Sequence, residues 1–203
     1  IELLNNDEGF FMMVESGKID WACHANDAAT VVHEVLGFAD SIQVAIDFAA
    51  EHPDETLILV TGDHETGGMT IGNATMGYDT AFDMLAAQKM SYVDFNNVVK
   101  EARATDASFD FPAAQALIEE QFGLVVQEGV KEGDELDSPF ILTAYELERL
   151  QAAFDESLIE KDERVSTQET GVLYGGYDPL SVTLTHILNN KAGIGWTSYA
   201  HTG

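Results

Sequence analysis

The sequence predicts an α/β fold, a mostly parallel sheet with flanking helices, together with an α-rich insertion. Two short apolar runs, 10–14 and 56–61, have the length and composition of strands buried in a parallel sheet. Between them, apolar residues from Val32 to Ala49 recur with the 3.6-residue period of an amphipathic helix. Strand, helix and strand in this order form a βαβ unit, in which the two strands are parallel and the crossover is right-handed.

The long helix has clear start and stop signals. Asn26 and Asp27 offer N-caps, and the proline-containing segment 52–55 ends the helix. Near the end of the chain, the segment 193–197 predicts a short strand that returns to the sheet.

Between Tyr78 and Lys191 helical patterns dominate. Thr143 and Glu146 have the spacing of a capping box, and Pro112 suits a first helical turn. The predicted helices are Thr80–Gln88, Tyr92–Ala104, Pro112–Phe122, Thr143–Glu160 and Pro179–Asn189. The chain therefore divides into a βαβ region over 1–77, an α-rich acidic insertion or subdomain over 78–191, and a returning core segment over 192–203.

The composition excludes several classes of protein. Asp and Glu number 36 against 9 Lys and Arg, a formal net charge of −27, so we expect no nucleic-acid-binding surface. Hydrophobic residues make up 45% and are interleaved with the acidic ones, which indicates a globular core and not a disordered acidic tail. No apolar run approaches the roughly 20 residues of a transmembrane helix, so we expect no membrane span, and no signal peptide is visible.

Residues with metal-binding side chains form three clusters, two of which directly follow the predicted strands. They are Glu15, Asp20 and His24 after the first strand, Asp63 and His64 after the second, and His201 near the end of the chain. Open α/β sheets bind their ligands at this edge. Asp oxygen and His nitrogen are suitable zinc ligands, and a site with two His and one Asp leaves positions free for substrate or water.

The spacing within the clusters suits metal binding. Asp20 and His24 are four residues apart, which places them on one face of a helical turn. Glu15 offers only oxygen and suits magnesium, whose octahedron is usually completed by water. Each piece alone has an ordinary explanation, because a lone Asp–His pair is more often a hydrogen-bonded turn and a lone Glu a cap or a solvated residue. The single Cys23 permits no intrachain disulfide and is interpreted as a small buried apolar residue.

Taken together, the clusters resemble the alkaline phosphatases. The stretch 9–24, GFFMMVESGKIDWACH, is similar to the family's magnesium and first-zinc segment, and 60–68, VTGDHETGG, to its second-zinc segment. The end of the chain, from Gly195 to Gly203, is similar to the segment with the last zinc histidine. Trp21, directly after the first-zinc aspartate, is similar to marine and cold-adapted bacterial members. The helical block between these motifs carries little resemblance.

This resemblance implies two zinc ions and one magnesium ion. It assigns Asp20, His24 and His201 to the first zinc, Asp63 and His64 to the second zinc, and Glu15 to magnesium. From the residues themselves, Trp21 is expected either to line the pocket or to pack in the core, and Glu65 and Thr66 are candidates to orient His64. The implied reaction is hydrolysis of phosphate monoesters through a phosphoserine, with inorganic phosphate as product and a zinc pair about 3.5–4 Å apart.

In complete family members the nucleophilic serine lies N-terminal to the segment that begins this chain. We therefore expect no catalytic nucleophile here, only the C-terminal half of the enzyme, a fragment inactive on its own. The resemblance also implies a homodimer when complete, and a periplasmic or secreted location. Two alternatives stay open: a sulfatase, phosphodiesterase or phosphomutase on the same metal scaffold, and a non-catalytic metal-binding or interaction module.

Overall fold

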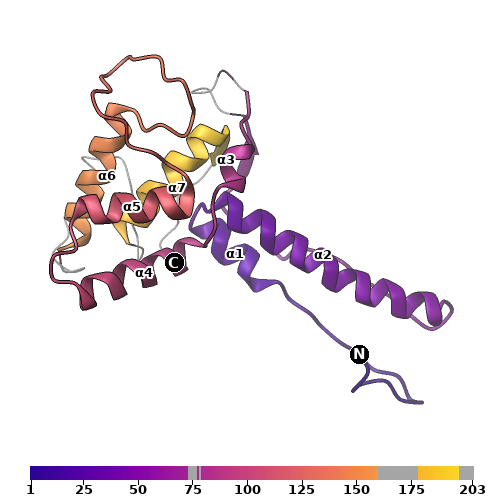
Figure 1. The fold of residues 1–203 in the computed structure, drawn as a ribbon. Coiled ribbons are helices and arrows are strands. Elements are labelled where there is room, and N and C mark those ends of the chain that lie inside the picture. The colour runs from indigo at the N-terminus through magenta and orange to yellow at the C-terminus, as the bar shows by residue number, and fades with distance from the viewer. Residues whose placement is uncertain (73–76, 78, 160–177, 197–203) are drawn as a thin grey trace.

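The computed structural model describes residues 1–72, 77, 79–159 and 178–196. The elements in chain order are α1 Gly17–His24, α2 Ala28–Glu51, β1 Met69–Ile71, α3 Asp83–Ala86, α4 Tyr92–Thr105, α5 Phe111–Phe122, α6 Ala144–Ser157, α7 Pro179–Ala192 and β2 Ile194–Trp196. Figure 1 shows α4 to α7 gathered into one helical block, from which α2 projects. The described residues are therefore mainly helical.

Side-chain caps fix the N-termini of most helices in the described residues. The Asp27 side chain accepts a hydrogen bond from the main-chain N–H of Thr30 and caps α2, as predicted. The capping box of α6 is complete: Thr143 Oγ1 accepts from the N–H of Glu146 at 3.2 Å, and Glu146 Oε2 accepts from the N–H of Thr143 at 2.8 Å. The predicted helices between residues 80 and 189 are confirmed, although α3 is limited to four residues.

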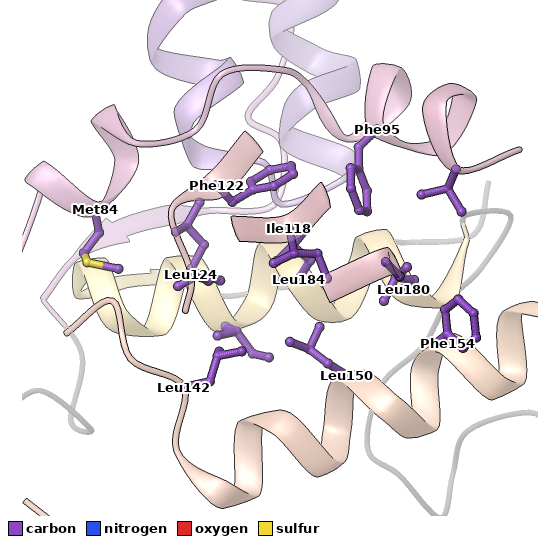
Figure 2. Packing of buried hydrophobic residues seen from close by; sticks show 14 of the residues in the cluster. Met84, Phe95, Ile118, Phe122, Leu124, Leu142, Leu150, Phe154, Leu180 and Leu184 are labelled. Atoms are coloured by element: carbon purple, nitrogen blue, oxygen red, sulfur yellow. The ribbon is translucent and has the colours of Figure 1, made fainter. Parts of the chain in front are cut away.

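The main hydrophobic core lies between the helices of this block (Figure 2). Phe95 of α4 and Phe122 of α5 meet edge to face, with ring centroids 5.1 Å apart. Leu150 of α6 and Leu184 of α7 are buried in the same cluster. Full burial of each such side chain contributes about 1.5–3 kcal/mol. The cluster also includes Ile194, so β2 is attached to the helical block.

The predicted parallel sheet is not confirmed. The segments 10–14 and 56–61 form no strand, and the sheet of the described residues consists of β1 paired antiparallel with β2. Phe11, Leu57 and Leu59 are 89%, 82% and 81% exposed. A parallel strand needs neighbouring strands for its backbone hydrogen bonds and covering helices for its two faces. The described residues supply neither around these two segments.

Helix α2 is apolar yet largely exposed. Val35, Leu36 and Val44 are all exposed, and the helix continues without interruption through Gly37. By length and composition α2 is able to cross a membrane: its most apolar window has a mean hydropathy of 1.2 and is 11% buried. The expectation that the chain has no membrane span is therefore not confirmed.

Two buried residues between α1 and α2 attach these helices to the helical block. The Asp27 carboxylate accepts from Gln88 Nε2 at 2.8 Å and from the N–H of Tyr92 at 3.0 Å, in addition to its capping bond. Asn26 has a left-handed backbone, with φ of 55°, and its carbonyl accepts from Asn189 Nδ2 of α7. These bonds hold α1 and the start of α2 against the loop before α4 and against α7.

Candidate metal centre

Helix α1 presents Asp20 and His24 on one face. His24 Nε2 lies 3.4 Å from Asp20 Oδ1, and the two side chains are 39% and 37% exposed. On its buried side, α1 packs Ala22 and Cys23 against Val31 of α2. The buried side fixes the helix, and the carboxylate and imidazole remain open to a ligand.

Asp63 and His64 lie in the segment that leads to β1. Asp63 Oδ1 accepts from the N–H of His64 at 3.0 Å, and Asp63 Oδ2 lies 3.5 Å from His64 Nε2. The hydrogen bond between His64 Nδ1 and the Glu65 carbonyl, at 3.0 Å, is the first cause of a raised pKa of His64, and the Asp63 carboxylate is the second. Protons therefore compete with a metal for His64 more strongly than they do for an ordinary histidine.

Thr66 joins the two clusters. Its hydroxyl donates to Asp20 Oδ1 at 2.7 Å and lies 3.3 Å from His64 Nδ1. Asp20 and Thr66 are 46 residues apart in the sequence, so only the tertiary fold brings them together. We expected Thr66 to contact His64; its bond to Asp20 had no signal in the sequence.

The turn after Thr66 packs closely on α1 and β2. A Cβ atom on Gly67, whose φ is +74°, would lie 3.0 Å from the Trp196 ring and 3.3 Å from the Cys23 carbonyl oxygen. Glycine is therefore required both by the backbone conformation and by the space. Burial, and then the nearby Asp20 carboxylate, raise the pKa of the Cys23 thiol, which stays protonated and is a poor metal ligand.

Glu15 lines a hollow at the start of α1. The hollow has a volume of about 280 Å³ and is formed by Glu15, Gly17, Lys18 and Trp21. The Lys18 ammonium lies 4.0 Å from the centroid of the Trp21 ring, and Trp21 is 59% exposed. Trp21 therefore lies at the surface of the hollow and not in the core. Lys18 was not among the predicted site residues, although it is the only Lys or Arg in residues 1–88.

The structure brings the predicted ligands together only partially. Within the described residues no group of three or more His, Cys, Asp and Glu side chains is arranged to hold a metal ion, and His201 lies outside them. The two carboxylate–imidazole pairs nevertheless fit zinc. In a tetrahedral site with ligand bonds of about 2.0–2.2 Å, neighbouring ligand atoms lie about 3.3–3.6 Å apart. The observed separations, 3.4 Å for Asp20–His24 and 3.5 Å for Asp63–His64, match this edge length.

The family model for alkaline phosphatase matches residues 1–203, and the chain belongs to the alkaline phosphatase family. It is 28% identical over its whole length to Alkaline phosphatase 3 of Bacillus subtilis (strain 168), of which it covers 35%. It is 48% identical over 73 residues to Alkaline phosphatase 4 of the same organism, which is 36% of this chain and 16% of that protein. The resemblance in the sequence motifs is thereby confirmed.

A solved structure supports the same assignment. The cold-active alkaline phosphatase from a psychrophile, Shewanella sp., superposes with a TM-score of 0.65 and is 30% identical in sequence. The match covers 98% of this chain and 38% of that one. The chain thus spans little more than a third of the length of these relatives.

Proposed function

We propose that this chain belongs to a zinc- and magnesium-dependent phosphatase that hydrolyses phosphate monoesters and releases inorganic phosphate. The observation that carries the proposal is the Thr66 hydroxyl, which links the first-zinc residue Asp20 to the second-zinc residue His64. The fit of both carboxylate–imidazole pairs to the edge of a zinc tetrahedron supports it.

The residues have the following roles in this proposal. Asp20, His24 and His201 bind one zinc, Asp63 and His64 the other, and Glu15 binds magnesium. When bound, the zinc pair stabilises the attacking and leaving oxygens of an in-line phosphoryl transfer.

Glu65 and Thr66 orient His64 and Asp20 for metal binding. In the tautomer in which the Glu65 carbonyl accepts from Nδ1–H of His64, the Nε2 lone pair would be available to a zinc ion. The Thr66 hydroxyl holds one oxygen of Asp20, so that the carboxylate does not rotate freely. Glu65 thus acts through its main chain.

The nucleophilic serine comes, in this proposal, from the rest of the phosphatase polypeptide. The same polypeptide supplies neighbouring strands for 10–14 and 56–61, whose apolar side chains are exposed in the described structure. The chain in this phosphatase divides into a metal-binding region over 1–77, an insertion over 78–191 and a returning segment over 192–203. The complete enzyme is a homodimer with a periplasmic or secreted location.

Metal analysis and turnover of p-nitrophenyl phosphate by the full gene product test this function. We expect about two zinc and one magnesium per chain, as a two-metal site requires, and loss of activity after chelation. His64→Gln should lower zinc content and turnover, whereas His33→Gln, on the exposed face of α2, should leave both unchanged.

A full-length protein without zinc, or hydrolysis that chelators do not affect, would contradict the proposal. Faster hydrolysis of phosphodiesters or sulfate esters than of phosphate monoesters would favour the other hydrolases of the superfamily. An intact gene without an upstream nucleophile segment would favour the non-catalytic module.

A further inference from the structure

Trp196, the last residue of β2, lies where three segments of the chain meet. It is the partner of Met69 in the antiparallel pair of β1 and β2. Its ring covers the turn at Gly67, where Cε3 and Cζ3 would lie 3.0 and 3.2 Å from an added Cβ atom. The ring also packs against the small cluster between α1 and α2 and against the main core. Among the partly buried side chains of the described residues, it alone packs against both clusters.

This contact joins the two segments that carry the carboxylate–imidazole pairs. One pair lies on α1, and the other lies a few residues before Gly67. The Cβ position of Gly67 is 3.0 Å from the Trp196 ring and 3.3 Å from the carbonyl oxygen of Cys23 in α1, so ring, turn and helix meet at one place. The hydrogen bond from Thr66 to Asp20 links the same two segments at a single point. An indole ring, which buries about 150–250 Å², also fixes the angle between them.

Hydrogen bonding does not explain a tryptophan at this position. Trp196 Nε1 is buried and has no hydrogen-bond partner among the residues that the structure describes. Buried indole N–H groups usually find a partner, and an unpaired one lowers the stability of the fold. A leucine or a phenylalanine would fill the apolar part of the site without this cost. The size and rigidity of the ring, and not its N–H group, are therefore what this position uses.

We propose that Trp196 is a positioning residue that sets the distance between the Asp20–His24 pair and the Asp63–His64 pair. The inference rests on the proposed function, in which each pair binds one zinc ion. Phosphoryl transfer between two metal ions needs an ion separation of about 3.5–4 Å. The ligand pairs must therefore be held at a fixed distance, and a misplacement of about 1 Å costs on the order of 100-fold in rate. Trp196 acts through the main chain of the two segments.

This role predicts a pattern that a loss of stability alone does not produce. A smaller side chain at Trp196 leaves every proposed metal ligand in place, so zinc still binds when it is supplied in excess. The relative position of the ligand pairs changes, however, and transition-state stabilisation suffers more than the binding of substrate. The turnover number kcat should therefore fall much more than KM changes.

The experiment compares Trp196→Leu and Trp196→Phe with Phe109→Leu in the full gene product, with zinc and magnesium in excess. Phe109 is also partly buried against the main core but lies between α4 and α5, so it controls for lost packing. We expect Trp196→Leu to lower kcat for p-nitrophenyl phosphate about 10–100-fold, with KM within about threefold. Trp196→Phe keeps a smaller ring over the turn and should lose about threefold in kcat. Phe109→Leu should keep the kcat of the unmodified protein.

Two further readouts do not depend on turnover. In a chelator competition, Trp196→Leu should weaken zinc binding about tenfold. The visible spectrum of the cobalt(II)-substituted protein reports the geometry around the metal and should change in Trp196→Leu. Phe109→Leu should alter neither. Circular dichroism at the assay temperature verifies that each variant is folded, and the same readouts on Trp196→Phe decide the question if Trp196→Leu does not fold.

An unchanged kcat and cobalt spectrum in both Trp196 variants would overturn the positioning role, and so would equal losses in Trp196→Leu and Phe109→Leu. The zinc content of the unmodified protein separates this result from a failure of the proposed function. Zinc bound without any effect of the Trp196 variants refutes the positioning role alone. An unmodified protein without zinc contradicts the proposed function and, with it, this inference.

Discussion

Asp27→Asn should destabilise the protein far more than its small chemical change suggests. The Asp27 carboxylate is 0% exposed and accepts four hydrogen bonds. Oδ1 accepts from the Thr30 N–H and from Gln88 Nε2, and Oδ2 accepts from Thr30 Oγ1 and the Tyr92 N–H. An asparagine keeps one acceptor oxygen and presents an NH₂ group to the donors on the other side.

The expected loss follows from this count. Up to two of the four bonds disappear, and in either orientation of the amide one main-chain N–H, that of Thr30 or that of Tyr92, is left buried opposite the NH₂ group. At about 1–1.5 kcal/mol per bond, Asp27→Asn should lower the free energy of unfolding by about 2–3 kcal/mol. Asp27→Ala also removes the N-cap of α2 and should lower it by about 4 kcal/mol. Since small domains have a total stability of about 5–15 kcal/mol, the milder variant is the better test.

Urea unfolding followed by far-ultraviolet circular dichroism measures the difference. Asp110→Asn is the matched control, because Asp110 is an exposed N-cap of α5 that accepts from Ala113 N–H, and Asn caps helices equally well. We expect a change within about 0.5 kcal/mol for this control. If the two variants had the same effect, the buried network around Asp27 would not be what attaches α1 and α2 to the helical block.

The remaining predictions concern pH, packing and metal affinity. Burial, and then the charge of Arg149, lower the pKa of His186 from 6.5 to about 4. On acidification the unfolded chain therefore protonates at His186 before the folded chain does. About 3 kcal/mol of stability that is present above pH 6.5 should be lost as the pH falls to 4. In urea unfolding, the free energy of unfolding of His186→Gln should vary with pH by this much less. Gly67→Ala should lower the free energy of unfolding by about 1–2 kcal/mol more than Gly129→Ala does in the same assay. Both glycines have a positive φ, but a Cβ atom at Gly67 would meet the Trp196 ring and the Cys23 carbonyl, whereas no atom lies within 4 Å of the Cβ position of Gly129. Equal losses would contradict the close packing around Gly67. Thr66→Val should weaken zinc binding about 10–100-fold in a chelator competition while Thr66→Ser should not, and equal affinities for all three chains would exclude the bridging role.

The sequence alone determined the features that depend on neighbouring residues. The helices between residues 80 and 189 follow from apolar period and capping signals, and the Thr143–Glu146 box forms as its spacing predicts. The Asp20–His24 pair also depends on a local rule, since residues four apart meet on any α-helix. Family membership could likewise be predicted, because the order of the motifs survives in the linear sequence.

Tertiary structure decided what depends on distant partners. The segments 10–14 and 56–61 have the composition of buried strands, but a strand forms only where other strands satisfy its backbone, and composition does not reveal whether those strands are present. The Thr66–Asp20 bond connects residues 46 apart, and the burial of Asp27 depends on the loop before α4. Local patterns fix which residues turn into a helix, whereas hydrogen bonds and packing between remote segments fix which side chains meet at a site.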